Sequence, residues 1–309
     1  MHAHAHAGEH SHHRSPASVL RVSTFVTLAY VVVLVIFGVR AHSLALLSEA
    51  GHNLSDVLAL VLSLAAVYIQ NRPPSTTKTY GYQRAGVLAA FVNAGALVVL
   101  ALVIFYEATQ RLLRPAPVHA GIMMAVAAIG VAMNAAIAFA LYQTSRDVNI
   151  RSAFLHMMGD TVSTAAVIAG GIVISLTGSY WIDPALSFAI GALILWSAVG
   201  IVRETLNILL EGTPRGMKLE KVSAAISAVE GVLGVHDLHV WSLGSESHAL
   251  SCHILIADLP LSESDSILQR INAKLLELFH IDHTTIQFEH VICEVAHGCV
   301  QPVTQQHPD

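Results

Sequence analysis

Residues 44–69 read LALLSEAGHNLSDVLALVLSLAAVYI, and residues 153–176 read AFLHMMGDTVSTAAVIAGGIVISL. Each stretch exceeds the roughly 20 residues that a helix needs to cross a bilayer. Each has a continuous apolar second half and a first half that polar residues interrupt. The polar halves carry the same pattern, His52-x-x-x-Asp56 and His156-x-x-x-Asp160. The two stretches therefore predict a pair of membrane helices that share one polar site.

The His-x-x-x-Asp spacing places an imidazole and a carboxylate on the same side of a helix, because residues four apart differ by only about 40° in direction. Two facing helices would supply two neutral imidazoles and two carboxylates, whose charge of about −2 balances a divalent cation. A charged residue at the centre of a membrane helix costs about 2.5 to 3.5 kcal/mol on insertion scales. This cost favours a divalent-metal site over isolated hydrogen-bonded pairs. The predicted ligands are His52, Asp56, His156 and Asp160.

The composition of the 309-residue chain is that of a multi-span membrane protein. Hydrophobic residues make up 54% and charged residues 12%, whereas soluble domains have about 25% charged residues. Six apolar segments have the length of spanning helices, and they cover residues 19–39, 44–69, 85–106, 122–142, 153–176 and 181–202. The second and fifth segments occupy corresponding positions in two three-helix halves, which indicates a binding site where the halves meet.

The distribution of Lys and Arg predicts the orientation of the spans. With the amino terminus inside, the inner loops and segment ends hold Arg14, Arg21, Arg72, Lys78, Arg84, Arg146, Arg151 and Arg203. The outer side holds only Arg40, Arg111 and Arg114. Six spans return the chain to its starting side, so both termini are expected in the cytoplasm.

The last third of the sequence has the pattern of a separate, acidic α+β domain. Residues 1–211 contain 11 Lys+Arg and 9 Asp+Glu, whereas residues 212–309 contain 5 and 12. The pattern predicts helices near 218–229 and 262–279 and strands near 235–243, 248–257 and 284–291. An acidic surface raises the local concentration of cations and makes nucleic acid an unsuitable partner.

The chain is thus divided into four predicted parts. A disordered cytoplasmic amino terminus, residues 1–16, is rich in histidine and of metal-binding composition, through His2, His4, His6, His10, His12 and His13. A six-helix transmembrane domain covers 17–208, a cytoplasmic dimerisation and metal-sensing domain covers 212–295, and a tail covers 296–309.

Several polar residues near the two pairs admit more than one role. Side chains one position or one turn away either orient the ligands or join the helices by hydrogen bonds, and they are Asn53, Ser55, Ser163 and Thr164. Glu49, one turn before His52, either helps cations reach the site or lies in the solvated interface. The sequence favours the solvated interface for Glu49.

The combined features resemble one family. They are the six spans, the two His-x-x-x-Asp pairs, the histidine-rich amino terminus, and the strings His236-Asp237-Leu238-His239-Val240-Trp241 and Thr285-Ile286-Gln287-Phe288-Glu289. Together they resemble the cation diffusion facilitator family, in particular its bacterial zinc, cadmium and cobalt resistance branch. Eukaryotic members often carry a histidine-rich loop between spans four and five, whereas residues 143–151 contain no histidine.

The resemblance implies a homodimeric secondary transporter in the inner (plasma) membrane. Such a protein exports cytoplasmic Zn2+, with Cd2+ and Co2+ as further candidate substrates, in exchange for H+, and serves metal tolerance and zinc homeostasis. The family's transport ligands map onto the two His-x-x-x-Asp pairs, and its tail domain is ferredoxin-like, as in metallochaperones. The resemblance implies zinc as substrate and regulatory ligand, and no organic cofactor.

For the tail, the resemblance implies a regulatory metal site. His236, His253 and Glu289 match family ligand positions, while Gln287 stands where some relatives have a ligating histidine. Cys293 and Cys299 are candidate thiolate ligands from across the dimer. The alternative, that these are ordinary surface residues, stays open.

Two other residues align with a known contact of relatives. Arg84 and Glu211 match positions where relatives place a salt bridge at the dimer contact; the alternative is two independent interfacial charges. Residues 76–82 offer Lys78 and Tyr82 where some relatives have metal-binding Asp and His. A second membrane-proximal metal site is therefore not expected in this loop.

Two other functions are alternatives to transport. An intramembrane zinc enzyme is disfavoured because the chain has no His-Glu-x-x-His motif and four protein ligands leave no position for catalytic water. A metal-sensing receptor would need only the tail. Ligands inside the spans favour movement of the ion instead, so the sequence predicts a transporter and no enzyme.

Overall fold

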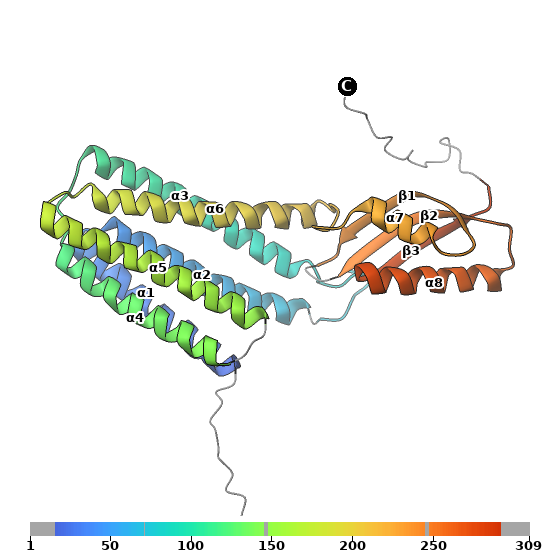
Figure 1. The fold of residues 1–309 in the computed structure, drawn as a ribbon, viewed down its shortest axis with the longest axis horizontal. Coiled ribbons are helices and arrows are strands. Elements are labelled where there is room, and N and C mark those ends of the chain that lie inside the picture. The colour runs from blue at the N-terminus through green and yellow to red at the C-terminus, as the bar shows by residue number, and fades with distance from the viewer. Residues whose placement is uncertain (1–15, 71, 145–147, 245–246, 292–309) are drawn as a thin grey trace, which may run out of the picture. The chain divides into compact units, whose positions relative to one another are not determined.

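The computed structural model describes residues 16–70, 72–144, 148–244 and 247–291. Within these ranges six long helices precede a small α+β domain (Figure 1). The helices are α1 Pro16–Ala41, α2 Leu44–Gln70, α3 Ala85–Leu113, α4 Ala120–Thr144, α5 Val148–Thr177 and α6 Ile182–Leu209. All six contain a stretch that is long and apolar enough to cross a membrane, which confirms the six predicted spans.

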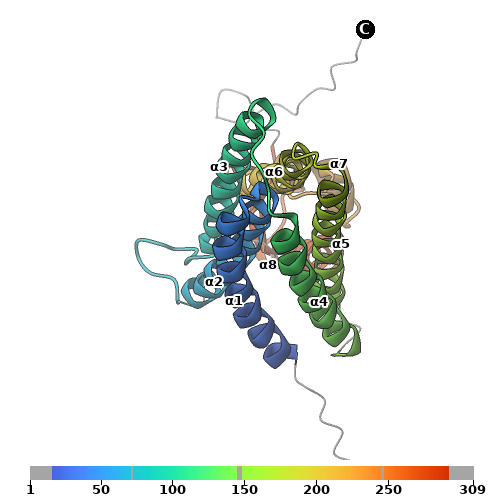
Figure 2. The ribbon, with the colours of Figure 1, turned by 90° about the vertical axis from the view of Figure 1, so that its left-hand side faces the viewer.

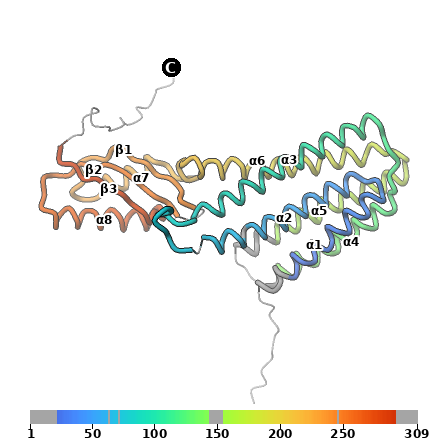
Figure 3. The backbone as a smooth tube through the Cα atoms, turned by 180° about the vertical axis from the view of Figure 1, so that it is seen from behind, coloured from blue at the N-terminus to red at the C-terminus, as the bar shows by residue number. Residues whose placement is uncertain are grey.

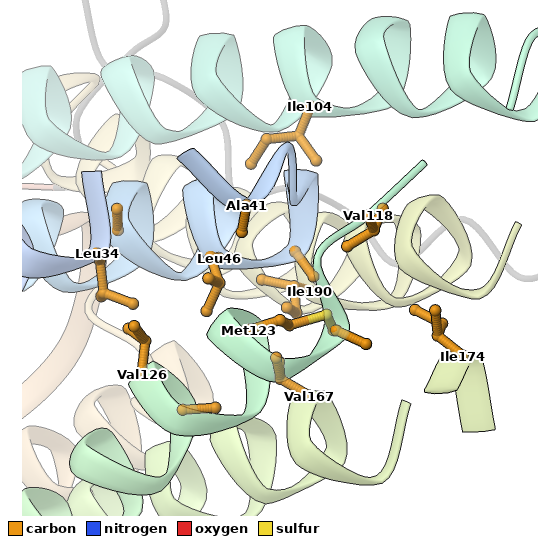
Figure 4. Packing of buried hydrophobic residues seen from close by; sticks show 14 of the residues in the cluster. Leu34, Ala41, Leu46, Ile104, Val118, Met123, Val126, Val167, Ile174 and Ile190 are labelled. Carbon is orange, nitrogen blue, oxygen red and sulfur yellow. The ribbon is translucent and has the colours of Figure 1, made fainter. Parts of the chain in front are cut away.

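One compact unit of the chain comprises residues 1–60 and 95–198. In its described part, α4 packs along α5 and also against α1 (Figure 2). Fully buried aliphatic side chains such as Leu34, Met123 and Val167 fill the space between the helices (Figure 4). Large apolar side chains such as Phe25 and Trp196 are exposed on the outer faces, as expected of helices that face lipid.

Gly130 allows α1, α4 and α5 to approach closely. A Cβ atom at this position would overlap the phenol ring of Tyr30 on α1 and would lie 3.0 Å from the Thr164 methyl group on α5. The Tyr30 hydroxyl passes the glycine and donates a hydrogen bond to the Val126 carbonyl at 3.2 Å. Small residues at such crossings let backbones approach in membrane helices, where packing rather than hydrophobicity holds the helices together.

Asp183 joins the beginnings of α2 and α6 to the end of α3. The side chain is fully buried, and its carboxylate accepts hydrogen bonds from Ser43 Oγ at 2.5 Å and from the Leu44 backbone N–H at 2.7 Å. Arg111 on α3 lies 3.7 Å from the same carboxylate and also donates to the carbonyl oxygen of His42. Since the first backbone N–H groups of a helix have no partner within it, Asp183 caps α2.

The second compact unit comprises residues 61–94 and 199–309, and its described part contains the α+β domain (Figure 3). The elements are α7 Leu219–Ser227, β1 Val232–Ser242, β2 His248–Ile256, α8 Leu261–Phe279 and β3 Ile281–Glu289. The sheet has the order β1-β2-β3, with β1 antiparallel and β3 parallel to the central β2. The order of helices and strands and the fold class predicted from the sequence are confirmed.

Buried and half-buried side chains alternate along most of β2. Leu250, Cys252, Ile254 and Ile256 are buried and pack with residues of α7 and α8 in one core. Burial raises the pKa of the Cys252 thiol to about 12, and the Asp237 carboxylate adds to the rise. Cys252 therefore stays a neutral thiol at physiological pH and belongs to the core rather than to a metal site, because metals bind the thiolate.

Replacing Asp183 with alanine is expected to destabilise the protein. The substitution leaves the Leu44 N–H and the Arg111 guanidinium without their carboxylate partner, and breaking a buried ion pair in this way costs about 3 kcal/mol or more. We expect a clearly lower midpoint of thermal unfolding in detergent. The control is Glu107→Ala, which removes an exposed carboxylate from α3. Equal midpoints for the two variants would contradict the capping role of Asp183.

Candidate metal sites

The two His-x-x-x-Asp pairs meet between α2 and α5. His52 and Asp56 lie on α2 and His156 and Asp160 on α5, and both pairs belong to the same compact unit. The apolar flanks of the two helices place these polar turns inside the helix bundle, where lipid offers no hydrogen bonds. The structure thus brings together all four residues that the sequence predicted as ligands.

Each imidazole contacts carboxylates from both helices. His52 Nε2 lies 3.2 Å from Asp160 Oδ1 and 3.9 Å from Asp56 Oδ2. His156 Nε2 lies 3.3 Å from Asp56 Oδ2 and 3.6 Å from Asp160 Oδ2. Single ligand atoms of His52, Asp56 and Asp160 lie within 4.8 Å of one another. His156 lies outside this group of three and joins the site through its contacts with the two carboxylates. Two imidazole nitrogens and two carboxylate oxygens are a ligand set that suits a tetrahedral divalent ion.

A cavity of about 310 Å³ reaches this site. Its walls include Asp56 and His156, the hydroxyl-bearing residues Ser23, Thr24 and Thr27 of α1, and apolar side chains of α4. Asp160 is nearly buried, with 6% of its side chain exposed, whereas His156 is 46% exposed. An ion therefore has a route to the more exposed ligands, while Asp160 forms the closed side of the site.

Glu49 does not lie in a solvated interface, so that prediction is wrong. Its side chain is fully buried, and its carboxylate accepts hydrogen bonds from Thr164 Oγ1 at 2.8 Å and from Ser163 Oγ at 3.4 Å. Glu49 lies one turn from His52 on α2, and Thr164 lies one turn from Asp160 on α5. The physical reason is that the polar side of α2 begins at Glu49 and is turned toward α5, so that Glu49 is buried between the two helices.

Other polar neighbours of the four candidate ligands also form hydrogen bonds inside the first compact unit. Asn53 donates to the Glu49 carbonyl at 2.9 Å, and Thr164 lies 2.7 Å from the Asp160 carbonyl. The Ser163 and Thr164 contacts with Glu49 cross between helices. Ser163 and Thr164 therefore join α2 to α5 directly beside the four candidate ligands.

The second candidate site lies on the sheet of the tail domain. His236 of β1, His253 of β2 and Glu289 of β3 have ligand atoms within 4.8 Å of one another. His253 Nδ1 lies 2.9 Å from Glu289 Oε1, and His236 Nε2 lies 3.2 Å from Glu289 Oε2. The structure thus brings these three predicted residues together, whereas Cys293, Cys299 and the histidines of residues 1–13 lie outside the described residues.

Asp237 is a neighbour of the tail site that sequence reasoning missed. Strict alternation along β1 would turn it away from His236, but the strand has an irregularity between His236 and His239, where Asp237 adopts a left-handed φ of 50°. Its carboxylate lies 3.9 Å from His253 Nε2 and 3.0 Å from His239 Nε2. The Asp237 carboxylate thus adds negative charge beside the three candidate ligands. No signal in the sequence marks the bulge.

Arg84 and Glu211 form an ion pair within one chain. Arg84 Nη2 lies 3.2 Å from Glu211 Oε1 and 3.5 Å from the Ser242 carbonyl oxygen. The two charges are therefore not independent. The pair joins the beginning of α3 to the segment that follows α6.

Comparison with known proteins agrees with these features. The profile of the cation efflux transmembrane domain matches residues 20–210, and that of the cation efflux protein cytoplasmic domain matches residues 214–291. The "Cadmium, cobalt and zinc/H(+)-K(+) antiporter" of Bacillus subtilis is 36% identical over 285 residues, which is 91% of this chain and 91% of the relative. The "Zinc transporter ZitB" of Escherichia coli is 36% identical over 295 residues, or 94% and 93%.

One solved structure is also similar in sequence. It is the metal-bound C-terminal domain of the CzcD transporter from Cupriavidus metallidurans, which is 36% identical, covers 24% of this chain and 99% of its own, and has a TM-score of 0.22.

Replacing Gln287 with histidine is expected to strengthen metal binding in the tail. Gln287 pairs in register with His253, and its amide donates to Glu289 Oε1 at 3.0 Å. An imidazole at this position would add a nitrogen ligand beside the three residues, and we expect zinc to bind about tenfold tighter or more. Chelator competition on the full chain, in an Asp160→Ala background that removes the membrane site, measures this change.

The matched control is Thr285→His, which places an imidazole on the same strand but opposite Ser251. Zinc affinity that is the same for Gln287→His and Thr285→His would contradict a metal site at these three residues.

Proposed function

Because the chain belongs to the cation diffusion facilitator family of membrane cation efflux transporters, we propose that it exports Zn2+ from the cytoplasm in exchange for H+. Cd2+ and Co2+ are further substrates under this proposal, since the Bacillus subtilis relative is named for all three metals. Export of this kind lowers cytoplasmic zinc and confers metal tolerance. The protein is a multi-pass membrane transporter, not an enzyme.

The observation that carries the proposal is the cluster of two imidazoles and two carboxylates between α2 and α5. Each imidazole nitrogen lies 3.2–3.9 Å from carboxylate oxygens of both helices. A mixed nitrogen and oxygen set favours zinc and similar transition metals over Mg2+ and Ca2+, which prefer oxygen alone. A site made from two helices also lets relative movement of the helices change the ion's exposure.

Proton coupling follows from the chemistry of the ligands. Zinc binds the neutral imidazole, so metal binding and protonation compete at the same nitrogen atoms. An imidazole titrates with an unperturbed pKa of about 6.5, which lies within the physiological range. When the ion leaves, His52 and His156 can each take up a proton beside a carboxylate. They must release it before the next ion binds, and this exchange defines antiport.

The remaining parts of the proposal concern assembly and regulation. The protein is a homodimer in the inner (plasma) membrane with both termini in the cytoplasm. The spanning part covers residues 17–208 and the tail domain covers 212–295. Zinc bound by His236, His253 and Glu289 of the tail tightens the dimer and favours transport when cytoplasmic zinc is high. Cys293 and Cys299 are additional candidate ligands for this regulatory ion.

A flux assay in liposomes tests the proposal. Purified protein is reconstituted with an internal zinc-sensitive dye, and zinc uptake is measured with and without an opposing pH gradient. We expect uptake to depend on the gradient and to fall by more than about 100-fold in Asp160→Ala. Removing a residue that only orients a metal ligand typically lowers metal affinity or activity about 10- to 100-fold, and removing the ligand itself should lower it more. The control is Glu107→Gln, which neutralises an exposed carboxylate on α3.

Uptake that continues unchanged after the pH gradient is collapsed would contradict proton antiport. If the reconstituted protein binds zinc but no zinc enters the vesicles with or without the gradient, the protein would instead be a metal-sensing receptor.

A further inference from the structure

Asn134 is a buried polar residue of α4 that neither the fold nor the proposed function explains. Its side chain is 1% exposed, and its Nδ2 atom has no hydrogen-bond partner among the described residues. Buried amides in proteins are almost always hydrogen-bonded, and a membrane interior offers no water to replace the partner. An unpaired donor in this position calls for an explanation.

The helix register places Asn134 level with Asp160. α4 and α5 are consecutive, antiparallel helices that pack along each other. At one end of the contact, Gly130 approaches Thr164; at the other, Leu141 packs with Phe154 and Met157. Asn134 lies one turn from Gly130, and the residue four positions before Thr164 on α5 is Asp160.

Asn134 also lies on the face of α4 that is directed toward the transport site. Ile137 and Leu141 line the cavity that contains Asp56 and His156. Gly130, Asn134, Ile137 and Leu141 follow one another at intervals of four, three and four residues, which keeps them on one side of an α-helix. The amide is therefore on the side of α4 that faces the ligands.

Asp160 has an unpaired acceptor that matches this unpaired donor. Its Oδ1 atom contacts His52 Nε2 at 3.2 Å, but its Oδ2 atom is buried and has no hydrogen bond within the described part of the chain. Oδ2 lies 3.6 Å from His156 Nε2, which is beyond hydrogen-bond distance. A carboxylate that ligates a metal through one oxygen is typically oriented by a hydrogen bond to the other oxygen.

We infer that Asn134 is a positioning residue of the transport site, whose Nδ2 donates a hydrogen bond to Asp160 Oδ2 when zinc occupies the site. The amide holds the carboxylate in one orientation through Oδ2. The other oxygen, Oδ1, is then presented to the ion together with His52 and His156. Asn134 lies beside the closed side of the site, where Asp160 is shielded from solvent. This inference rests on the proposed function, because it assigns a role toward the same transported ion.

The test measures zinc affinity at the membrane site in two variants. Both are made in a His253→Ala background of the full chain, so that the tail site does not contribute. Asn134→Leu has a similar volume but no donor, and we expect its zinc dissociation constant to rise about 10- to 100-fold, as for other residues that orient metal ligands. Asn134→Asp keeps the shape and replaces the donor with an acceptor, so we expect it to bind zinc as weakly as Asn134→Leu or more weakly.

Asn134→Asp also separates positioning from ligation. If the side chain at position 134 coordinated zinc directly, the added carboxylate would tighten binding, and that result would overturn the inference. Parental zinc affinity in both variants would overturn it as well, including when the unfolding midpoint falls, because a role in packing alone lowers the midpoint without weakening zinc.

Asn93→Leu is the matched control, since Asn93 is a half-buried asparagine of α3; its affinity should stay at the parental value. The His253→Ala parent separates this test from that of the proposed function. A parent that binds no zinc at the membrane site, or shows no flux, contradicts the proposed function. A parent that binds and transports zinc, with unchanged affinity in the Asn134 variants, contradicts only the role of Asn134.

Discussion

The first compact unit, which contains both His-x-x-x-Asp pairs, depends on the compensation of its buried carboxylates. Asp56 and Asp160 lie on two apolar helices, and an isolated carboxylate there would carry a large desolvation penalty. Each is instead placed beside imidazoles of both helices, at distances of 3.2–3.9 Å. Under the proposed function, a divalent ion would complete this compensation when it binds, and protons on the imidazoles would complete it when the ion leaves. One requirement would then account for binding, release and coupling to protons.

Buried carboxylates also hold the helices of this unit in register. Glu49 accepts hydrogen bonds from two hydroxyl groups of α5, and Asp183 caps α2 while contacting Arg111 of α3. Such polar contacts have few competing arrangements in lipid, because an unpaired partner is costly. They fix which faces of α2 and α5 meet, and so they set the geometry of the four candidate ligands.

The sequence predicted the parts of this structure that repeat with a simple period. The six spans and the order of the tail elements follow from hydrophobic length and alternation. The pairing of His52 with Asp56 and of His156 with Asp160 follows from helical spacing. The contacts between the two pairs do not follow from spacing. They are expected only because a carboxylate in a membrane helix needs a partner that offsets its desolvation.

Features that depend on packing partners were not predictable in the same way. The burial of Glu49 cannot be read from its neighbours in the sequence, because its hydroxyl partners are more than a hundred residues away. Asp237 reaches the tail site only through a bulge and a left-handed backbone conformation, which no periodicity encodes. Asn134 lies at the same height as Asp160 because of how α4 is aligned along α5. The lengths and hydropathy of the two helices do not determine this alignment.

The central claim is that the ion is held by two imidazoles and two carboxylates in the membrane. X-ray absorption spectroscopy of zinc bound to the His253→Ala protein tests this most directly, since it reports the identity and number of the ligand atoms. The account predicts about four nitrogen and oxygen ligands near 2.0–2.2 Å, with outer scattering from two imidazole rings. Sulfur ligands, or a six-coordinate shell without imidazole scattering, would contradict it.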